Sequence, residues 1–172
     1  NMAVLEQLRG WKDDHTIEIE DVRSRYIRLA ELGFHTGPFQ TIEAVWLNGT
    51  ERSAVGRLRL PDDWSHEHDA YYCVHPAVLD GAFQLCGILV DVSESEEEIW
   101  VPARISSLRM YRQANFQGAV WARVKLASDG LAGKAFDIDI FDEHGVLMKV
   151  EGFLLSKFQT TGATLSKSLL HT

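Results

Sequence analysis

The sequence predicts one α+β domain in which a curved antiparallel sheet surrounds a single long helix. Its 172 residues, 45% of them hydrophobic, are enough to form one core. A strongly apolar helical stretch, residues 77–90, stands between a hairpin pattern and about four later strand patterns. Because such a helix must be covered on several sides, we expect the sheet to wrap around it.

The first regular element expected is a helix that starts at about Glu20. Val22 and Tyr26 fall on one face of this helix, and Gly33 is expected to end it. Residues 1–18 are polar and irregular, so we interpret them as a lead-in or linker.

A β-hairpin is expected after this helix. Residues 41–47 are rich in strand-favouring side chains, and Asn48-Gly49 is the preferred two-residue turn. The second strand of the hairpin is expected to run to about Leu60, and residues 61–69 form a polar loop before the apolar helix.

The second half of the chain has the pattern of antiparallel strands. Phe136, Ile138 and Ile140 alternate with aspartates, which is typical of a strand with one buried face. A curved sheet around a central helix is the hotdog arrangement, which we expect over residues 19–158, with residues 159–172 as a flexible tail or linker. The strands expected after the helix cover residues 100–112, 116–127, 134–141 and 146–158.

Composition argues against several functions. The formal net charge is -8, which disfavours nucleic acid as a partner because phosphate binding needs a basic surface. No apolar stretch reaches membrane-spanning length, and residues 1–10 lack the features of a signal peptide. Only Cys73 and Cys86 occur, too few for a disulfide framework, so we expect a reducing, cytoplasmic location.

The most informative segment is residues 75–84, His-Pro-Ala-Val-Leu-Asp-Gly-Ala-Phe-Gln. A helix places Asp80 and Gln84 on one face, where Gln84 can donate a hydrogen bond to the carboxyl. The helix N-terminus favours a charged Asp80, whereas burial favours the neutral acid, which can protonate a leaving hydroxyl. An interpretation in which Asp80 caps or binds nearby backbone is equally compatible with this spacing.

The same segment resembles the HPxxLDxxxQ motif of the dehydratase domains of modular polyketide synthases. Residues 17–40 resemble the helix and the G-x-x-Y-G-P-x-F segment that open the second half of those domains. Residues 100–111 resemble the strand that follows their central helix. The similarity keeps one order over residues 17–158 and implies the second, C-terminal hotdog of a double-hotdog dehydratase.

The resemblance also implies a chemistry. In that family a histidine of the first hotdog removes the α-proton of a β-hydroxyacyl thioester, and an aspartate of the second protonates the departing hydroxyl. Carried over, Asp80 is the general acid and Gln84 its orienting partner. The substrate is tethered to the phosphopantetheine arm of an acyl carrier protein, and the elimination needs no metal or redox cofactor.

Two departures from the family pattern bear on activity. None of the seven histidines lies in the H-x-x-x-G-x-x-x-x-P motif of the catalytic histidine. Thr36 stands where the family has a tyrosine, and the spacing from it to Phe39 is one residue short. Thr36 and Pro38 are candidate substrate-binding residues, together with His75 and Pro76, which also shape the turn into the helix.

The residues leave three hypotheses open. The first is dehydration of a β-hydroxyacyl chain on acyl carrier protein to an α,β-enoyl thioester, with the base on a first hotdog outside this chain. The isolated chain would then show little or no turnover. The second is a non-catalytic structural or docking domain of a polyketide synthase, and the third is a related product-template or pyran-forming domain.

Two smaller expectations concern partners and metals. Without its first hotdog the chain would expose the surface that meets that partner, so we expect self-association. The run His66-Glu67-His68-Asp69 has the composition of a metal site. We interpret it as a solvated loop, because neighbouring residues cannot easily share one tetrahedral ion.

Overall fold

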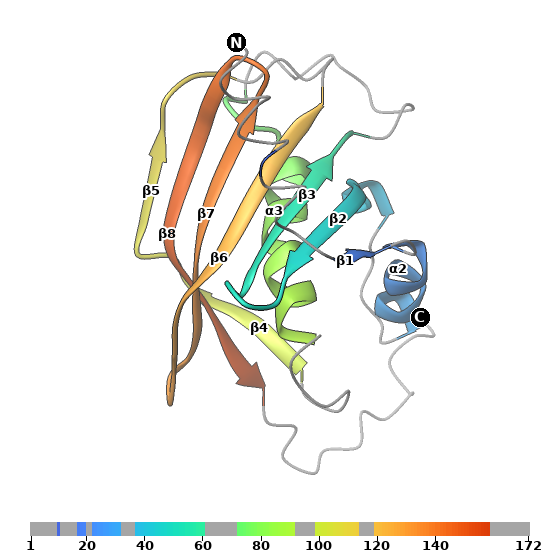
Figure 1. The fold of residues 1–172 in the computed structure, drawn as a ribbon, viewed down its shortest axis with the longest axis vertical. Helices are drawn as coiled ribbons and strands as arrows, with labels where there is room; N and C mark the ends of the chain where they lie inside the picture. The colour runs from blue at the N-terminus through green and yellow to red at the C-terminus, as the bar shows by residue number, and fades with distance from the viewer. Residues whose placement is uncertain are drawn as a thin grey trace, which may run out of the picture.

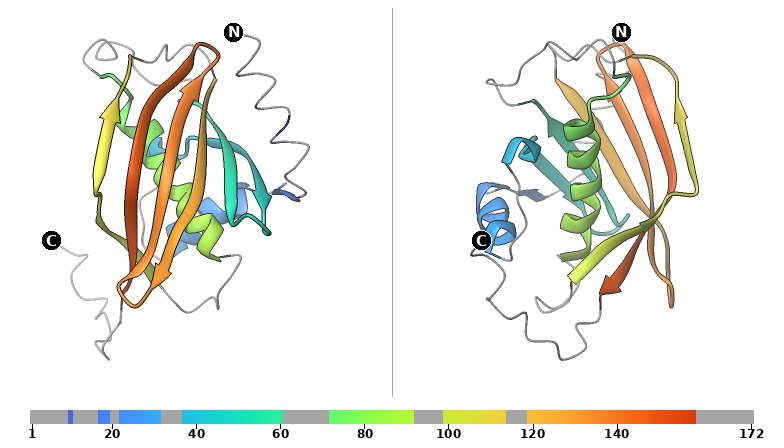
Figure 2. Two further views of the ribbon diagram at one scale, coloured as in Figure 1. Left: turned by 60° about the vertical axis from the view of Figure 1, so that its left-hand side comes forward. Right: turned by 180° about the vertical axis from the view of Figure 1, so that it is seen from behind.

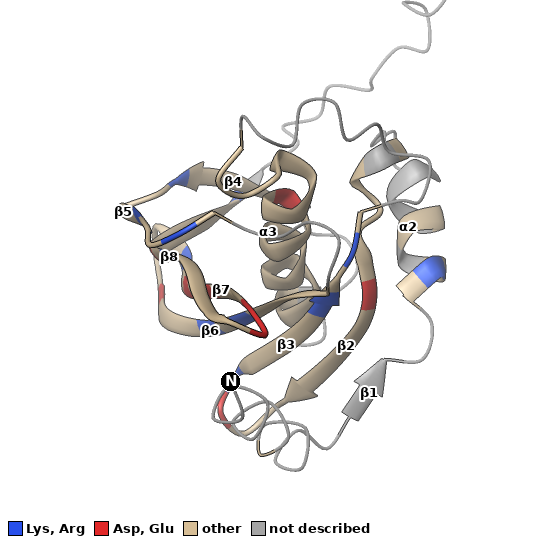
Figure 3. Ribbon diagram, turned by 90° about the horizontal axis from the view of Figure 1, so that it is seen from above, with Lys and Arg blue, Asp and Glu red and all other residues tan. Residues whose placement is uncertain are grey.

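The computed structural model describes residue 10 and residues 17–19, 22–31, 37–60, 72–91, 99–113 and 119–158. Within these residues an antiparallel sheet curves around helix α3 (Figure 1; Figure 3 looks along this helix), which confirms the expected hotdog fold. The strand order is β1-β2-β3-β6-β7-β8-β4, and β5 also pairs with β8. The elements are β1 (Ile17–Ile19), α2 (Val22–Glu31), the 3-10 turn η1 (Gly37–Phe39), β2 (Ile42–Asn48), β3 (Ser53–Leu58), α3 (Pro76–Asp91), β4 (Ile99–Arg104), β5 (Ser107–Met110), β6 (Val120–Gly130), β7 (Gly133–Asp142) and β8 (Gly145–Phe158).

Helix α3 is held by the inner face of the sheet (Figure 2). Val78, Ala82 and Leu85 follow one helical stripe and are at most 1% exposed. Leu85 packs directly on the backbone of β3 at Gly56, where a side chain would come within 2.6 Å of a Leu85 methyl group. Since Leu and Val side chains each gain roughly 1.5–3 kcal/mol on burial, this packing contributes favourably to the domain's stability.

The inner face of the sheet consists of continuous apolar rows that run across the strands. Paired residues build two such rows from β2 to β8, and their members are buried. Both rows continue onto β5, where they end in Leu108 and Met110, which are 42% and 54% exposed. The rows are Leu47, Ala54, Val124, Ile138, Val150, Leu108 and Val45, Gly56, Ala122, Ile140, Met148, Met110.

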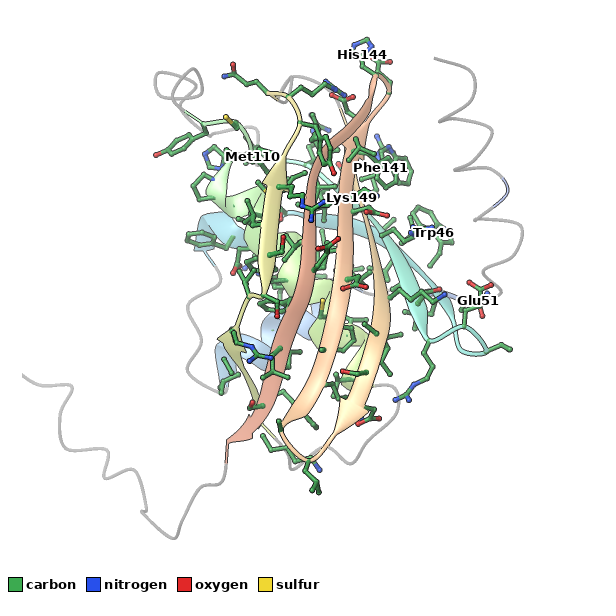
Figure 4. The ribbon with its side chains drawn as sticks, turned by 90° about the vertical axis from the view of Figure 1, so that its left-hand side faces the viewer. Trp46, Glu51, Met110, Phe141, His144 and Lys149 are labelled. Carbon is green, nitrogen blue, oxygen red and sulfur yellow. The ribbon has the colours of Figure 1, made fainter. Side chains whose placement is uncertain are left out.

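The outer face of β5 to β8 carries charges instead. Asp139 on β7 lies between Arg123, 2.7 Å away on β6, and Lys149, 3.5 Å away on β8. Figure 4 shows Lys149 on this face. The alternation predicted from Phe136 and Ile138 is therefore confirmed, because the apolar residues point to α3 and the charged ones point away.

The hairpin turn differs from the two-residue turn predicted at Asn48-Gly49. Asn48 pairs with Ser53, so the connection is residues 49–52, and Gly49 does not have the positive φ of the expected turn. The Asn48 side chain instead accepts the Glu51 N–H at 3.0 Å, and Arg52 has a positive φ of 49°. The asparagine acts through its side chain, in the manner of an Asx turn.

The strand predicted over residues 100–112 is also divided. It forms β4 and β5, which pair with different parts of β8. Gly152, at φ 63°, lies within β8 between these parts, and a side chain there would meet Ser106. The extra residue in β8 is a β-bulge, which bends the sheet around α3.

The N-terminal boundary differs as well. Residues 17–19 form β1 and pair with residues 45–47 of β2, although the predicted irregular lead-in extended to residue 18. The expected tail, residues 159–172, and the polar loop, residues 61–69, lie outside the described residues. No helix in the described part of the chain is long and apolar enough to cross a membrane.

The contact between Gly81 of α3 and Thr41 provides a test of this packing. A side chain at Gly81 would clash with Thr41 Oγ1, whereas Thr41 Cβ lies 3.5 Å from the same position. We therefore expect Gly81→Ala to lower the free energy of unfolding by about 1–3 kcal/mol, the usual cost of overpacking. Thr41→Ala should remove the clash, so that Gly81→Ala costs little in that background; chemical denaturation of all four variants measures this. Equal costs in both backgrounds would contradict this contact.

Candidate active site

The candidate site lies on the first turns of α3, and His75 and Pro76 position it. Pro76 is the first helical residue, where its missing N–H leaves no bond unmade. The His75 carbonyl accepts the Leu79 N–H at 3.0 Å, and its Nδ1 accepts the Ala77 N–H at 3.1 Å. The 2%-exposed His75 therefore caps the helix, as expected for a residue that shapes this turn.

Asp80 and Gln84 form the predicted hydrogen bond. Gln84 Nε2 donates to Asp80 Oδ2 at 2.6 Å and also to the carbonyl of Phe39, in η1, at 3.2 Å. Two acceptors thus orient the amide, and its oxygen Oε1 is buried without a hydrogen-bond donor among the described residues. Gln84 therefore holds one oxygen of the carboxyl in place and links it to η1.

Burial determines the electrostatics of Asp80. Loss of hydration raises the pKa of its carboxyl, and the hydrogen bond from Gln84 lowers it by less. Of the opposing tendencies recognised in the sequence, burial is therefore the stronger, and it shifts the pKa toward the neutral acid. No backbone N–H in the described structure donates to Asp80, so the backbone-capping interpretation finds no support here. A carboxyl of this kind can donate a proton to a nearby leaving group.

Residues 39–42 pack against the start of α3, a contact that the sequence did not predict. Thr41, which is 1% exposed, donates from Oγ1 to the Ala77 carbonyl at 3.1 Å. The Ile42 N–H donates to the Tyr26 hydroxyl at 3.1 Å. Burial, followed by smaller effects that include the Asp80 charge, raises the pKa of Tyr26 to about 12. A buried phenol of α2 therefore lies within electrostatic reach of Asp80.

The remaining candidate residues are only partly covered by the structure. Pro38 lies within η1, next to the Phe39 carbonyl that Gln84 binds. Thr36 and the acidic and histidine-rich run at residues 66–69 lie outside the described residues. Among the residues that are described, no group of three metal-binding side chains lies together.

A second feature lies at the other end of α3 and is separate from Asp80. A cavity of about 290 Å³ lies there, next to Leu89 and Val90. Lys134 also lines it and pairs with Asp129 at 2.7 Å, although Lys134 was assigned to a plain strand in the sequence. Its full lining is Gly49, Arg52, Leu89, Val90, Leu126, Lys134 and Phe136.

Comparison with known proteins agrees over most of the chain. A family model described as the polyketide synthase dehydratase N-terminal domain matches residues 9–164. Polyketide synthase GfsE of Streptomyces halstedii is 30% identical over 140 residues, which are 80% of this chain and 3% of that protein. Polyketide synthase PksN of Bacillus subtilis is 29% identical over 133 residues, 71% of this chain and 2% of that protein.

Solved structures are similar in both fold and sequence. The dehydratase domain from the CurK module of curacin polyketide synthase matches with a TM-score of 0.73 and 26% identity, over 89% of this chain and 52% of that one. Two inactive mutants of this dehydratase, one with histidine replaced by phenylalanine and one with aspartate replaced by asparagine, match with the same TM-score and identity. The chain spans about half the length of these dehydratase domains and a few per cent of the synthases. It belongs to the polyketide synthase dehydratase family.

Proposed function

We propose that this chain is the acid-bearing half of a dehydratase that removes water from a β-hydroxyacyl chain on acyl carrier protein. The observation that carries the proposal is the half-buried Asp80 carboxyl, oriented at 2.6 Å by Gln84 at the N-terminal end of α3. Desolvation raises the pKa of this carboxyl, which favours its protonated form and suits it to general acid catalysis.

The proposed step uses one proton donor and one base. The Asp80 O–H proton passes to the β-hydroxyl oxygen as the carbon–oxygen bond breaks, and water leaves. A base removes the α-proton, and that electron pair forms the double bond of the α,β-enoyl thioester. Because the thioester carbonyl makes the α-proton acidic, an acid, a base and polarisation of the carbonyl are sufficient for this elimination.

The assignment to the second half of the dehydratase rests on motifs. The chain carries the aspartate motif at residues 75–84 and lacks the histidine motif of the first hotdog. The matching family model bears the description of an N-terminal domain, whereas these motifs favour the C-terminal half. In the CurK dehydratase, a histidine mutant and an aspartate mutant are both described as inactive. By analogy, we assign the acid to Asp80 and the base to a companion hotdog.

Among the described strands β5 pairs with β8 alone, and its other edge is the surface that would meet this companion. Leu108 and Met110 end the two buried inner rows and remain 42% and 54% exposed (Met110 is labelled in Figure 4). The C-terminal end of β5 lies near the segment that leads into α3, because Gln113, just after β5, donates to the carbonyl of Tyr72 at 3.1 Å. An apolar row that ends in exposed side chains is expected to continue into a partner. In its absence a second copy of this chain can occupy the same edge.

Substitution of Asp80 tests the acid role. In a dehydratase that joins this chain to a first hotdog, Asp80→Asn should reduce turnover of a β-hydroxyacyl thioester by about 100-fold or more, the usual contribution of general acid catalysis. The matched control is Glu51→Gln, which neutralises an exposed carboxylate in the β2–β3 turn (Figure 4) and should leave the rate unchanged. The isolated chain should show little turnover in the same assay.

The alternative of a non-catalytic docking domain gives a different result. Its support is the altered segment at Thr36, where the family tyrosine is missing. In that case the joined domain would be inactive before any substitution. Near-normal turnover of Asp80→Asn would instead remove Asp80 from the acid role.

The raised pKa of Asp80 also predicts how stability depends on pH. A carboxyl whose folded-state pKa lies above its unfolded value of 3.8 destabilises the folded state once it ionises. This loss appears as the pH rises through the folded-state pKa and is absent below the unfolded value. We therefore expect Asp80→Asn to be more stable than the natural chain at pH 7, by an amount that shrinks on acidification. Urea denaturation at several pH values measures it, and a constant difference would contradict the raised pKa.

The β5 edge predicts self-association of the isolated chain. Leu108→Lys combined with Met110→Glu should shift the chain to monomer in light scattering, because charges on the inner rows cannot be buried at low cost. The control is Leu131→Glu, which changes a fully exposed apolar residue in the β6–β7 turn and should leave association intact. A natural chain that is monomeric at high concentration would count against this interface.

A further inference from the structure

We propose that Tyr26 of α2 is a positioning residue for the Asp80 carboxyl, and that it acts through residues 39–42, here called the 39–42 segment. The proposal rests on the proposed function, since it concerns the same site. The missing tyrosine at Thr36 left the sequence without a phenol near the acid. Tyr26, whose hydroxyl is bonded to this segment, is a different phenol beside the site.

The 39–42 segment is tied at three points to elements on both sides of it. At its end, the Ile42 N–H donates to the Tyr26 hydroxyl at 3.1 Å. In its middle, Thr41 Oγ1 donates to the Ala77 carbonyl at 3.1 Å. At its start, the Phe39 carbonyl accepts from Gln84 Nε2 at 3.2 Å. The last of these ties reaches Asp80 directly, because the same nitrogen donates to its carboxyl at 2.6 Å.

The phenol oxygen, rather than the bulk of the ring, is what the segment requires. Tyr26 is 6% exposed, Ile42 is 7% exposed and Thr41 is 1% exposed, so water has little access to this hydrogen bond. Phenylalanine would fill the same space but would leave the buried Ile42 N–H without its acceptor. A buried N–H without a partner is costly, so the segment would move until the group is satisfied.

A shift of the 39–42 segment would change the surroundings of the Asp80 carboxyl through two contacts. One is the amide of Gln84, which would lose the carbonyl that orients it. The other is the packing of Thr41 on Gly81, the residue that follows Asp80 in α3. The two side chains are also coupled electrostatically, because the Asp80 charge contributes to the raised pKa of Tyr26 after the larger effect of burial.

The test compares Tyr26→Phe with Val22→Ala, one helical turn earlier in α2. Val22 is 7% exposed and belongs to the same core, so its truncation loosens α2 without touching the phenol oxygen. The readout is an NMR titration of the Asp80 carboxyl in the 172-residue chain. In Tyr26→Phe, admission of water would lower the Asp80 pKa, whereas a weakened Gln84 hydrogen bond would raise it. Because burial is the larger of the two causes, the net effect should be a lower pKa, closer to its ordinary value. Val22→Ala should leave it unchanged. Equal titration curves for Tyr26→Phe and the natural chain would overturn the proposal.

A second pair of variants tests another hydrogen bond of the segment, the one from Thr41 to α3. Thr41→Ala removes the hydroxyl that binds the Ala77 carbonyl, whereas Thr41→Ser retains it. We expect the alanine variant to lower the pKa of Asp80 as Tyr26→Phe does, and the serine variant to restore the natural value. This pair also decides the question if Tyr26→Phe does not fold. Alanine and serine variants that titrate alike would show that the segment does not position the acid.

Measurements of kcat and KM distinguish the positioning role of Tyr26 from the acid role of Asp80. In the joined dehydratase, Tyr26→Phe should lower kcat about tenfold with little change in KM, because the acid is misplaced while substrate binding persists. Val22→Ala should keep the natural kcat. Normal turnover of Asp80→Asn would refute the acid role, whereas the titrations of Tyr26→Phe and Thr41→Ala would still report on positioning. A natural kcat in Tyr26→Phe would refute the inference alone.

Discussion

Burial of α3 in the curved sheet is the constraint on which the rest of the structure depends. Its stripe of Val78, Ala82 and Leu85 is almost fully covered, and Gly56 of β3 leaves the space that Leu85 fills. Because successive residues of a helix are 100° apart, Asp80 and Gln84 cannot share this stripe and face η1 instead. The same helix therefore anchors the core with one side and presents an acid on the other. A helix with less apolar surface could not hold a partly desolvated carboxyl at such a defined place.

Features that depend on local pattern could be predicted from the sequence. The apolar run that became α3, the alternation through Phe136 and Ile138, and the bond between Asp80 and Gln84 all follow from side-chain spacing. The errors occurred where a contact without periodicity, near or far in the chain, decides the backbone. The break between β4 and β5 follows from a bulge at Gly152 in another strand, and the 49–52 turn follows from the side chain of Asn48. Neither effect leaves a periodic signal in the segment that it changes.

Within the candidate site, too, sequence spacing could predict only the contacts between residues that are close in the chain. Its two central residues lie four positions apart, so helical geometry was enough to bring them together. Its supports come from far along the chain: Phe39 is 45 residues from Gln84, and Thr41 is 36 residues from Ala77. Tyr26 was predicted only as a member of an apolar face, because a phenol that accepts a backbone N–H has the same spacing as one that merely packs. The charge state of Asp80 was undecided for a related reason, since burial is a property of the assembled fold.

The position of Asp80 on α3 also bears on why a dehydratase of this kind would need two halves. Among the described residues, the Asp80 carboxyl is bonded by Gln84 and by no base. In this chain the inner rows end uncovered at Leu108 and Met110 on β5, whose C-terminal end lies near the segment that leads into α3. A companion hotdog docked on this edge would cover the apolar rows and, in the same contact, bring a base toward the acid. Apolar burial would then drive the association, while Gln84 and the 39–42 segment keep the carboxyl oriented before the partner and substrate arrive.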